Sequence, residues 1–380
     1  MQKVQLGQCF QHSNVRRVAI ISSQTGKFSK NSGLSIFELA CQPCIEILND
    51  DSICKTDIDA VIFSSCCADQ YISNIISEFL GIKPKICYRI DNLCNSGTNA
   101  IVSAFSYISS GLCDSVLVIG AEKANSPGSR LTWDITRGSF TFPVHWAALF
   151  AKAYMRRYGT SEEQLAMISV KNHANAEKNE NALFNKAVTL EEVMSSRTIV
   201  APLKLLDCSS LCDGASAMLL MAEDKALKLS DTPVWIKGIG QQTNSASFSK
   251  VTEDLCGIGT AKIAAKEAYN MAEVTPRQID VVELHDAFTI LEILGYEDLG
   301  FVAKGEGGKF VNQKDIAINP RGGILGCGHP IGTTGVAQTA EIVAQLSGNA
   351  DKRQVDKCTV GLVHNLAAAG TSSTVIILGV

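Results

Sequence analysis

The feature that most constrains this chain is an internal repeat: a turn rich in small residues, then a helical segment, then a strand. The turn CNSGTNA begins at Cys94 and precedes a helix and the strand 114–120. The turn GHPIGTTG contains His329, 235 positions later, and precedes a helix and the strand 359–364. Repeated strand–helix order predicts mostly parallel sheets covered by helices, so we expect a duplicated α/β fold.

The rest of the chain fits two such halves, 1–230 and 231–380. Segment 122–205 has no counterpart in the second half, and we interpret it as an inserted loop domain that carries binding surface. Apolar runs predict strands at 15–21, 59–63, 114–120, 234–239, 281–284, 359–364 and 374–378. Helical spacing predicts helices at 34–48, 94–110, 261–271, 287–299 and 330–346.

Composition excludes several classes of protein. Hydrophobic residues make up 46% of the 380 and charged residues 19%, which excludes intrinsic disorder. The net charge of −4 provides no basic field for nucleic acid, and no apolar run is long enough to span a membrane. Residues 1–13 lack the apolar stretch of a signal peptide, and fourteen cysteines then indicate free thiols in a reducing compartment. We expect a cytoplasmic enzyme.

Cys94 is the strongest single candidate for catalysis, since it stands at the expected start of a helix. The unpaired N–H groups and partial positive charge at a helix N-terminus favour a thiolate. Small neighbours leave room for a substrate carbonyl and for the local N–H as an oxyanion donor. Among fourteen cysteines, one taken alone is more often structural, so the interpretation depends on what lies nearby.

Three histidines supply that context. His329 lies in a stretch with six glycines between positions 322 and 335, which predicts a tight loop ahead of a helix. His285 follows the predicted strand 281–284 and His364 lies at the end of the predicted strand 359–364, and ligands of open α/β sheets bind beyond the carboxyl ends of strands. A histidine beside a thiol can act as its base or as an oxyanion donor. We therefore expect these histidines and Cys94 to form one site.

Other cysteines and glycines carry weaker signals. Cys41 and Cys44 have C-x-x-C spacing within a helical pattern; a zinc or redox role is the alternative to two buried small residues. Cys66 and Cys67 are interpreted as core or loop thiols. The glycines form neither the GxGxxG nor the GxxxxGK[ST] element, so nucleotide binding of those types is not supported.

Together, these motifs resemble the thiolase superfamily, and most closely its sterol-carrier-protein-2-type and archaeal acetoacetyl-CoA branch. The resemblance covers nearly the whole chain in the family's order. It rests on LCNSG around Cys94, HDAF followed by EILGYEDLGF, NPRGGILGCGHPIGTTG, HNLAAAG from His364, and LLDCSSLCDGASA. It implies the thiolase fold: two duplicated βαβαβαββ halves in αβαβα layers, with a loop domain inserted in the first half.

The resemblance also implies roles for the site residues. Cys94 would be the nucleophile that takes the acyl group, and His329 would activate it and help hold the thioester oxygen. His285 would stand in the first oxyanion site, and the N–H of Cys94 would serve the second with one near Leu366. Coenzyme A thioesters would be the substrates and would lie against the loop domain, with no tightly bound cofactor and no metal.

Assembly is implied in the same way. Such enzymes are homodimers or homotetramers. In some archaeal systems the thiolase also joins a small zinc-bearing scaffold protein and the next enzyme of the mevalonate pathway, a downstream synthase.

The chain departs from the family at its second acid/base. Many thiolases carry a cysteine in a C-x-G motif where this chain has His364-Asn365-Leu366, and the HDCF cysteine of this branch is Ala287 here. Alanines 367–369 also replace residues that are often glycine. We expect His364 to move the α-proton; a structural hydrogen bond from His364 to His329 or its loop is the alternative. Cys327 is the other nearby thiol.

Three functions remain open at this point. The first is a thiolase that condenses two acetyl-CoA, or cleaves acetoacetyl-CoA or a longer 3-oxoacyl-CoA. The second is a related Cys-His-His condensing enzyme or retro-aldolase, which the missing second thiol permits. The third is a catalytically weak subunit that scaffolds a multienzyme complex, against which the intact set of Cys94, His329 and His285 argues.

Overall fold

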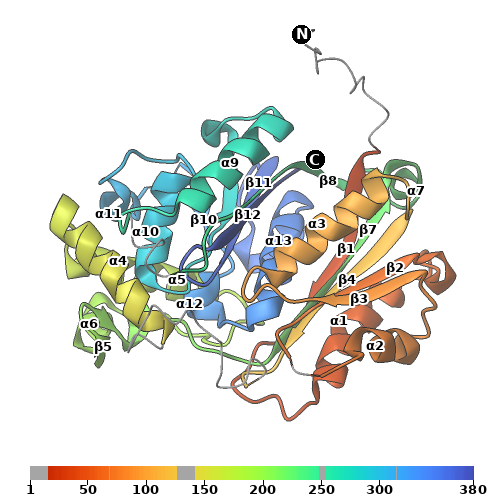
Figure 1. Ribbon diagram of the computed structural model, residues 1–380, viewed down its shortest axis with the longest axis horizontal. Coiled ribbons are helices and arrows are strands. Elements are labelled where there is room, and N and C mark those ends of the chain that lie inside the picture. Colours follow the sequence, from red (N-terminus) through yellow and green to blue (C-terminus); the bar gives the residue numbers. More distant parts are fainter. Residues whose placement is uncertain (1–15, 68, 126–141, 248–253, 314) are drawn as a thin grey trace, which may run out of the picture.

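The computed structural model describes residues 16–67, 69–125, 142–247, 254–313 and 315–380 (Figure 1). The polar start of the chain and residues 126–141 of the insertion lie outside them.

The first half contains β1 (Val18–Thr25), α1 (Ile36–Leu48), β2 (Ala60–Ser64), α2 (Ile72–Leu80), β3 (Ile86–Ile90), α3 (Ser96–Ser109), β4 (Ser115–Glu122), α4 (Pro143–Tyr158), α5 (Glu162–Ala176), α6 (Leu190–Ser195), β5 (Thr198–Val200), β6 (Leu203–Lys204), β7 (Gly214–Ala222) and α7 (Glu223–Leu229). The second half contains β8 (Val234–Thr243), α9 (Gly259–Ala272), β9 (Val281–Glu283), α10 (Thr289–Asp298), α11 (Gly307–Phe310), β10 (Ala317–Ile318), α12 (Gly323–Cys327), α13 (Thr334–Leu346), β11 (Val360–Ala367) and β12 (Ser372–Gly379).

The two halves have the same strand order. It runs β1-β7-β4-β2-β3 in the first half and β8-β12-β11-β9-β10 in the second. In each half the first two pairs are antiparallel and the last two are parallel. The halves meet where Ala19 and Ile20 of β1 pair with Trp235 and Val234 of β8. The expected duplication of a βαβαβαββ unit is therefore confirmed.

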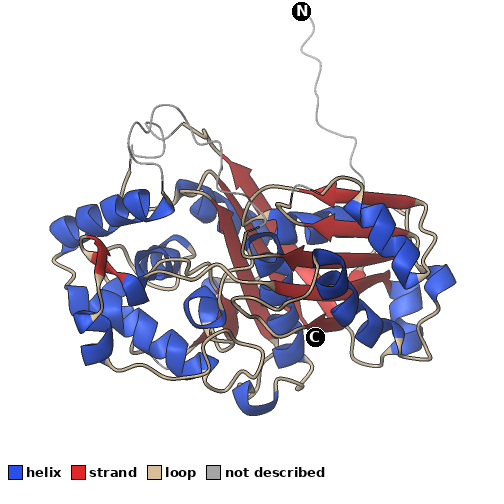
Figure 2. Cartoon of the chain, turned by 90° about the horizontal axis from the view of Figure 1, so that it is seen from below, coloured by secondary structure: helices blue, strands red, loops and turns tan. Residues whose placement is uncertain are grey.

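Side chains on successive residues of β4 show how the layers are stacked. Val116 and Val118 pack with α3 and α13, whereas Leu117 and Ile119 pack with α1 and α2. In the second half, α9 and α10 cover the outer face in the same way. The central helices α3 and α13 therefore lie between the two half-sheets, with helices outside each, as Figure 2 shows.

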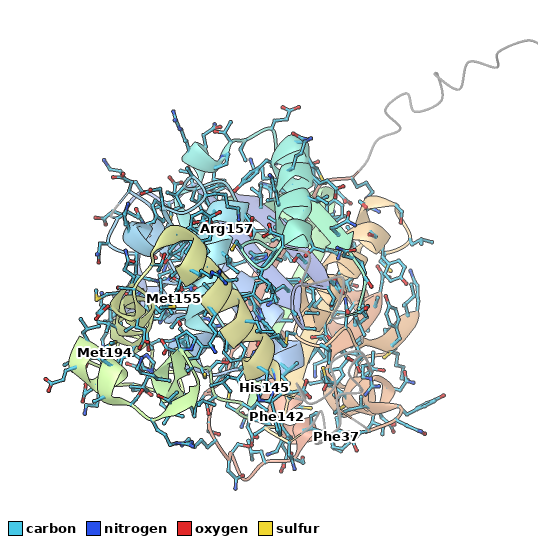
Figure 3. All side chains as sticks on the ribbon, turned by 60° about the vertical axis from the view of Figure 1, so that its left-hand side comes forward. Phe37, Phe142, His145, Met155, Arg157 and Met194 are labelled. Carbon is cyan, nitrogen blue, oxygen red and sulfur yellow. The ribbon has the colours of Figure 1, made fainter. Side chains whose placement is uncertain are left out.

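The insertion belongs to the first half in sequence but packs on the second half in space. Trp146 and Phe150 of α4 share a core cluster with α9 and α10. The ring of Trp146 meets that of Phe288 edge to face, with centroids 5.4 Å apart. Figure 3 shows α4 at the surface, with His145 near one end and Arg157 farther along. The insertion thus rests directly against the segment that follows His285.

The N-terminal ends of α3 and α13 touch through glycines. A Cβ on Gly97 would lie 2.7 Å from the backbone nitrogen of Val336, and a Cβ on Gly335 would lie 2.6 Å from that of Thr98. Backbones can approach this closely only where both positions lack a side chain. The duplication therefore brings the two repeated turns face to face at the centre of the molecule.

We expect Gly97→Ala to lower the free energy of unfolding by about 1–3 kcal/mol, because the added methyl must displace backbone atoms. Gly259→Ala is the matched control, since nothing lies within 4 Å of its Cβ position in α9; we expect it to be neutral or slightly stabilising. Urea denaturation of both variants measures the difference. Equal stabilities for the two variants would contradict the close contact.

Four expectations from the sequence need correction. The helix predicted from 94 begins at Ser96, so Cys94 precedes it, and the helix predicted from 330 becomes regular only at Thr334. His364 does not lie at the end of its strand but inside β11. The glycine-rich loop around His329 contains the short helix α12 and is buried. Among the described residues, no helix has the length and apolar character needed to cross a membrane.

Candidate active site

Cys94 and His329 face one another where the two repeated turns meet. The distance from Sγ of Cys94 to Nε2 of His329 is 3.2 Å. Nδ1 of His329 lies 2.8 Å from Oγ1 of Thr334, and its backbone N–H donates to the carbonyl of Ser210. With its proton on Nδ1 and directed to Thr334, His329 presents the lone pair of Nε2 to the thiol. This is the arrangement of a nucleophile beside its base.

The free site holds a neutral thiol beside a neutral imidazole. Burial raises the pKa of Cys94 to about 12, although the N–H groups of Cys94 itself and Ala368 act in the opposite direction. Burial, followed by the positive charge of Arg321, lowers the pKa of His329 to about 4. The backbone donors favour a thiolate, as the position before the helix predicts, but burial opposes it more strongly. The proton must pass to His329 as the sulfur attacks.

This resting state predicts the pH dependence of alkylation. The thiolate is the reactive form, so the rate at Cys94 should rise by about tenfold per pH unit from pH 6 to pH 9, without a plateau. Iodoacetamide labelling followed by peptide mass spectrometry measures it. Exposed Cys54, whose pKa is lowered by its hydrogen bonds to Thr56, is the internal control. A plateau below pH 7 at Cys94 would instead show a stable thiolate–imidazolium pair.

His285 stands beside His329. The two ring centroids are 5.5 Å apart at an interplanar angle of 81°. Burial, together with repulsion from His329 and His364, holds the pKa of His285 well below its usual value. Its imidazole is therefore neutral and has one N–H to donate, as the first oxyanion site requires.

Asp286 holds this segment against the loop of His329. Its carboxylate accepts the N–H groups of Ile324 and Leu325, at 2.6 and 3.2 Å, and the side-chain amide of Asn172 at 2.6 Å. Asp286 thereby ties the segment that carries His285 to the first turn of α12 and to helix α5 of the insertion. This role was not predicted from the sequence, in which the HD pair was the only available signal.

His364 lies within β11, opposite Val375 of β12. It is 1% exposed, and neither ring nitrogen has a hydrogen-bond partner among the described residues. The alternative of a structural hydrogen bond to His329 or its loop therefore has no support. Burial lowers the pKa of His364 to about 4, so its imidazole is neutral near pH 7. Buried polar groups without partners are rare in folded proteins, which makes His364 a candidate for a functional role.

The backbone donor near Leu366 that acts on Cys94 is the N–H of Ala368. Leu366 is paired with Ser373 in the ladder between β11 and β12. Ala368 follows β11 with φ of 51°, and its N–H is one of the two that favour the thiolate of Cys94. A left-handed conformation costs a non-glycine residue about 1–2 kcal/mol. A glycine at position 368 would avoid this cost, whereas this chain has alanine there.

The two thiols near the catalytic loop lie differently from expectation. Cys327 points away from the site, because its sulfur donates to the carbonyl of Arg321 at 2.9 Å. Cys66, interpreted as a core or loop thiol, lies within electrostatic reach of Cys94, and its pKa is raised by burial and then by the negative charges of Glu122 and Asp91. The fold thus presents Cys66, and not Cys327, as the second thiol near Cys94.

Ala287 and the C-x-x-C pair are also placed. The carbonyl of Ala287 accepts the N–H of Ser209, which ties the HDAF segment to the stretch that leads into β7. Cys41 and Cys44 lie in α1, and Cys44 donates to the carbonyl of Ala40 within the helix. Cys44 is buried, and Cys41 is half-buried.

The site has the geometry of a small metal-binding cluster as well as that of a nucleophile. Sγ of Cys94 and one ring nitrogen each of His285 and His329 lie within 4.8 Å of one another. Thiolate and imidazole are ligands that zinc accepts. Acyl transfer requires a free sulfur, so a metal bound there would block it.

Comparisons with known proteins agree with this geometry. The family described as "Thiolase, N-terminal domain" matches residues 16–224, and "Thiolase C-terminal domain-like" matches residues 240–380. An acetyl-CoA acetyltransferase of Methanothermobacter thermautotrophicus is 38% identical over 381 residues, covering 95% of this chain and 99% of the relative. Human sterol carrier protein 2 is 30% identical over 388 residues, covering 94% and 71%.

A solved structure gives the same result. The structure described as "Ltp2-ChsH2(DUF35) aldolase" matches with a TM-score of 0.85 at 26% identity, covering 97% of this chain and 99% of that chain. Both thiolase domains match in order over nearly all of the sequence, as the resemblance in the motifs predicts. The chain therefore belongs to the thiolase family.

Proposed function

We propose that this protein is an acyl-CoA C-acyltransferase that condenses two acetyl-CoA to acetoacetyl-CoA, or cleaves a 3-oxoacyl-CoA with coenzyme A. The observation that carries the proposal is the contact of 3.2 Å between Cys94 and His329, with backbone N–H groups beside the sulfur. The acetyl-CoA acetyltransferase at 38% identity supports it.

The first half-reaction uses these two residues. The Sγ–H proton of Cys94 passes to Nε2 of His329 while the sulfur attacks the thioester carbonyl. Donors beside the sulfur hold the oxyanion, the C–S bond to coenzyme A breaks, and the departing thiolate recovers the proton from His329. The product is acetyl-Cys94. Because both groups start neutral, no buried charge has to be maintained between turnovers.

The second half-reaction needs a base for the α-proton of the incoming acetyl-CoA. His364 is neutral, has no partner among the described residues and lies near His285, so it can take that proton while His285 donates to the enolate oxygen. The α-carbon then attacks acetyl-Cys94, the C–S bond breaks, and the Cys94 thiolate recovers the proton that His364 removed, which restores the neutral site. Coenzyme A would reach the site along the insertion that packs on Phe288.

The direct test is thiolysis of 3-oxoacyl-CoA substrates of increasing chain length. Purified protein and free coenzyme A should release acetyl-CoA from acetoacetyl-CoA or a longer homologue, as followed by chromatography. Activity with one range of lengths would define the substrate class. A protein that acetylates Cys94 but cleaves none of them would overturn the proposal.

A retro-aldolase is the second candidate, and two observations favour it. The matched solved structure is described as an aldolase, and His364 and Ala287 stand at the two positions where many thiolases and this branch, respectively, carry a second thiol. An aldolase breaks a carbon–carbon bond without an acyl-cysteine. Aldol cleavage that persists in Cys94→Ala would therefore identify it.

Assembly is also proposed from the comparisons. The matched solved structure pairs Ltp2 with ChsH2, a DUF35 protein, and we propose a small zinc-bearing scaffold protein as a partner of this chain in the cytoplasm. We expect the chain itself to be at least dimeric, with β3 as an edge strand of the sheet that a second copy could cover. Light scattering at micromolar concentration measures this, and a monomeric mass would contradict it.

A further inference from the structure

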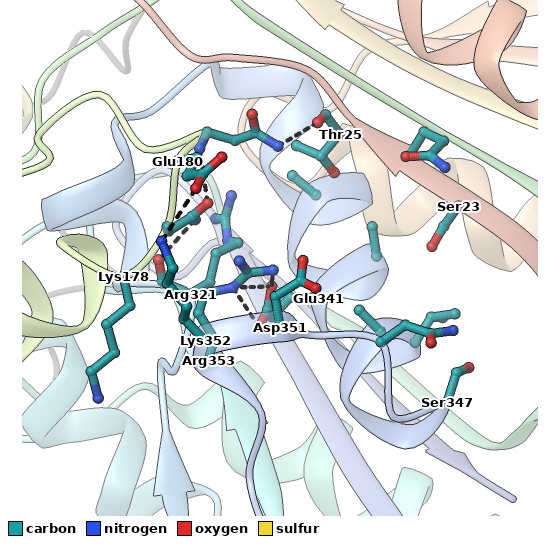
Figure 4. A pocket seen from close by; sticks show the side chains of 18 of the residues that line it. Ser23, Thr25, Lys178, Glu180, Arg321, Glu341, Ser347, Asp351, Lys352 and Arg353 are labelled. Atoms are coloured by element: carbon teal, nitrogen blue, oxygen red, sulfur yellow. Dashed lines mark hydrogen bonds and ion pairs between the residues drawn. The ribbon is translucent and has the colours of Figure 1, made fainter.

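A cavity of about 830 Å³ lies apart from the catalytic residues (Figure 4). It opens between the second half of β1, the segment 178–181, the last turns of α13 and the segment 349–353. Cys94 and the three site histidines are not among its described lining residues. Its volume is typical of sites for small molecules.

Arg321 is the buried cation in this lining. The residue is 3% exposed, and its Nε and Nη2 atoms have no hydrogen-bond partner among the described residues. One carboxylate oxygen, Oε2 of Glu283, lies 3.5 Å from Nε. Burial raises the pKa of Glu283 to about 8 against the opposing effect of Arg321, so this single carboxyl offsets only part of the charge of Arg321. A buried guanidinium with two nitrogen atoms that lack hydrogen-bond acceptors is costly.

The rest of the lining favours an anion. Four basic side chains face three acidic ones: Lys178, Arg321, Lys352 and Arg353 against Glu180, Glu341 and Asp351. Arg353 is held by Glu341, with Nη2 and Oε2 3.0 Å apart, whereas Lys352 and Glu180 form an exposed pair at 3.4 Å. Among the described lining residues, the buried positive charge left without a hydrogen-bond acceptor is therefore that of Arg321.

We propose that this cavity binds a small anion carrying a carboxylate or phosphate group, held by Arg321 with help from Arg353, and that the bound anion acts on the loop of His329. Guanidinium groups bind both kinds of oxyanion through paired N–H donors. Arg321 and His329 lie on the same loop, and the N–H of Arg321 donates to Oε1 of Glu283, two residues before His285.

The electrostatics give the direction of this effect. The positive charge of Arg321 is the second cause, after burial, of the lowered pKa of His329. An anion beside Arg321 offsets that charge, so His329 accepts the proton of Cys94 more readily. Whether this effect changes the turnover rate rests on the proposed function. Its influence on the reactivity of the Cys94 thiol does not rest on that function.

Calorimetric titration with inorganic phosphate and with citrate, at ionic strength kept constant with chloride, tests the site. We expect saturable binding of at least one anion. Arg353→Gln should weaken it by about tenfold or more, and Ser347→Trp, at the exposed rim, should block it. Lys225→Gln is the control, because it removes a charge from the partly exposed pair with Asp114 outside the cavity. Phosphate binding alone or citrate binding alone identifies the preferred group.

Two results would overturn the site. One is that neither phosphate nor citrate binds the wild type, or that the wild type and every variant give the same weak calorimetric response. The other is displacement of the anion one for one by coenzyme A, which would assign the cavity to the substrate. Because Arg321→Met leaves Glu283 without its partner, it is made together with Glu283→Gln, and this double variant should also lose binding.

Alkylation of Cys94 tests the action on the loop. At a saturating anion concentration, the iodoacetamide rate should rise at least about twofold in the wild type and stay unchanged in Ser347→Trp. An unchanged wild-type rate would overturn the coupling. Since alkylation requires no thiolase turnover, this outcome is distinct from a failure of the proposed function.

Discussion

Acetyl-CoA should acetylate Cys94 specifically, and Cys94→Ser should lose condensation and thiolysis by more than about a thousandfold. The reason lies in the proton transfer to His329. The imidazole is a weak base here, with a pKa of about 4, and a serine hydroxyl releases its proton far less readily than a thiol. Peptide mass spectrometry after incubation with acetyl-CoA locates the acetyl group, and a coupled assay measures the loss.

Cys54→Ser is the matched control for this prediction. Cys54 is exposed, and hydrogen bonds to Thr56 lower its pKa, so it is chemically the easier thiol to ionise. Its thiol is paired with Thr56 and not with a histidine, and the variant should keep full activity. Acetylation of Cys54 with none on Cys94 would show that solution reactivity, and not the site, selects the thiol.

His364→Ala should separate the two half-reactions. Cys94 should still be acetylated at a rate within about threefold of the wild type, because His329 performs that step. Condensation and thiolysis should fall by about 10²–10⁴-fold, the usual contribution of a positioned base. Acetyl transfer from radiolabelled acetyl-CoA measures the first step alone, and formation of acetoacetyl-CoA measures both.

The conservative variant His364→Asn fills most of the same space without a base, so equal losses in both variants exclude a packing effect. If acetylation itself collapses, His364 activates Cys94, as in Cys-His-His condensing enzymes. If both steps survive, the base lies elsewhere, and Cys66→Ala is the next variant, because the structure turns Cys327 away. Ala287→Cys, which installs the usual thiol of this branch, should restore part of the lost condensation.

Much of the fold follows from local patterns. The turn before α3 and the turn before α13 share small residues and helical spacing, and such signals depend only on neighbours along the chain. The insertion was recognisable because it interrupts the repeat. Helix α2 and strands β3, β7 and β10 were not predicted from the pattern. β10 has only two residues, and β3 mixes polar and apolar positions. Neither strand therefore shows a clear periodic pattern of apolar residues.

The sequence by itself determined that Cys94 and His329 are equivalent positions of a duplicated unit, and a duplicated unit brings equivalent positions together. Only the tertiary structure decided what surrounds them. It turned Cys327 toward Arg321, brought Cys66 near the nucleophile and left His364 without a partner among the described residues. These outcomes depend on the direction of single side chains and on contacts between distant segments, whereas a sequence pattern records only neighbours along one chain.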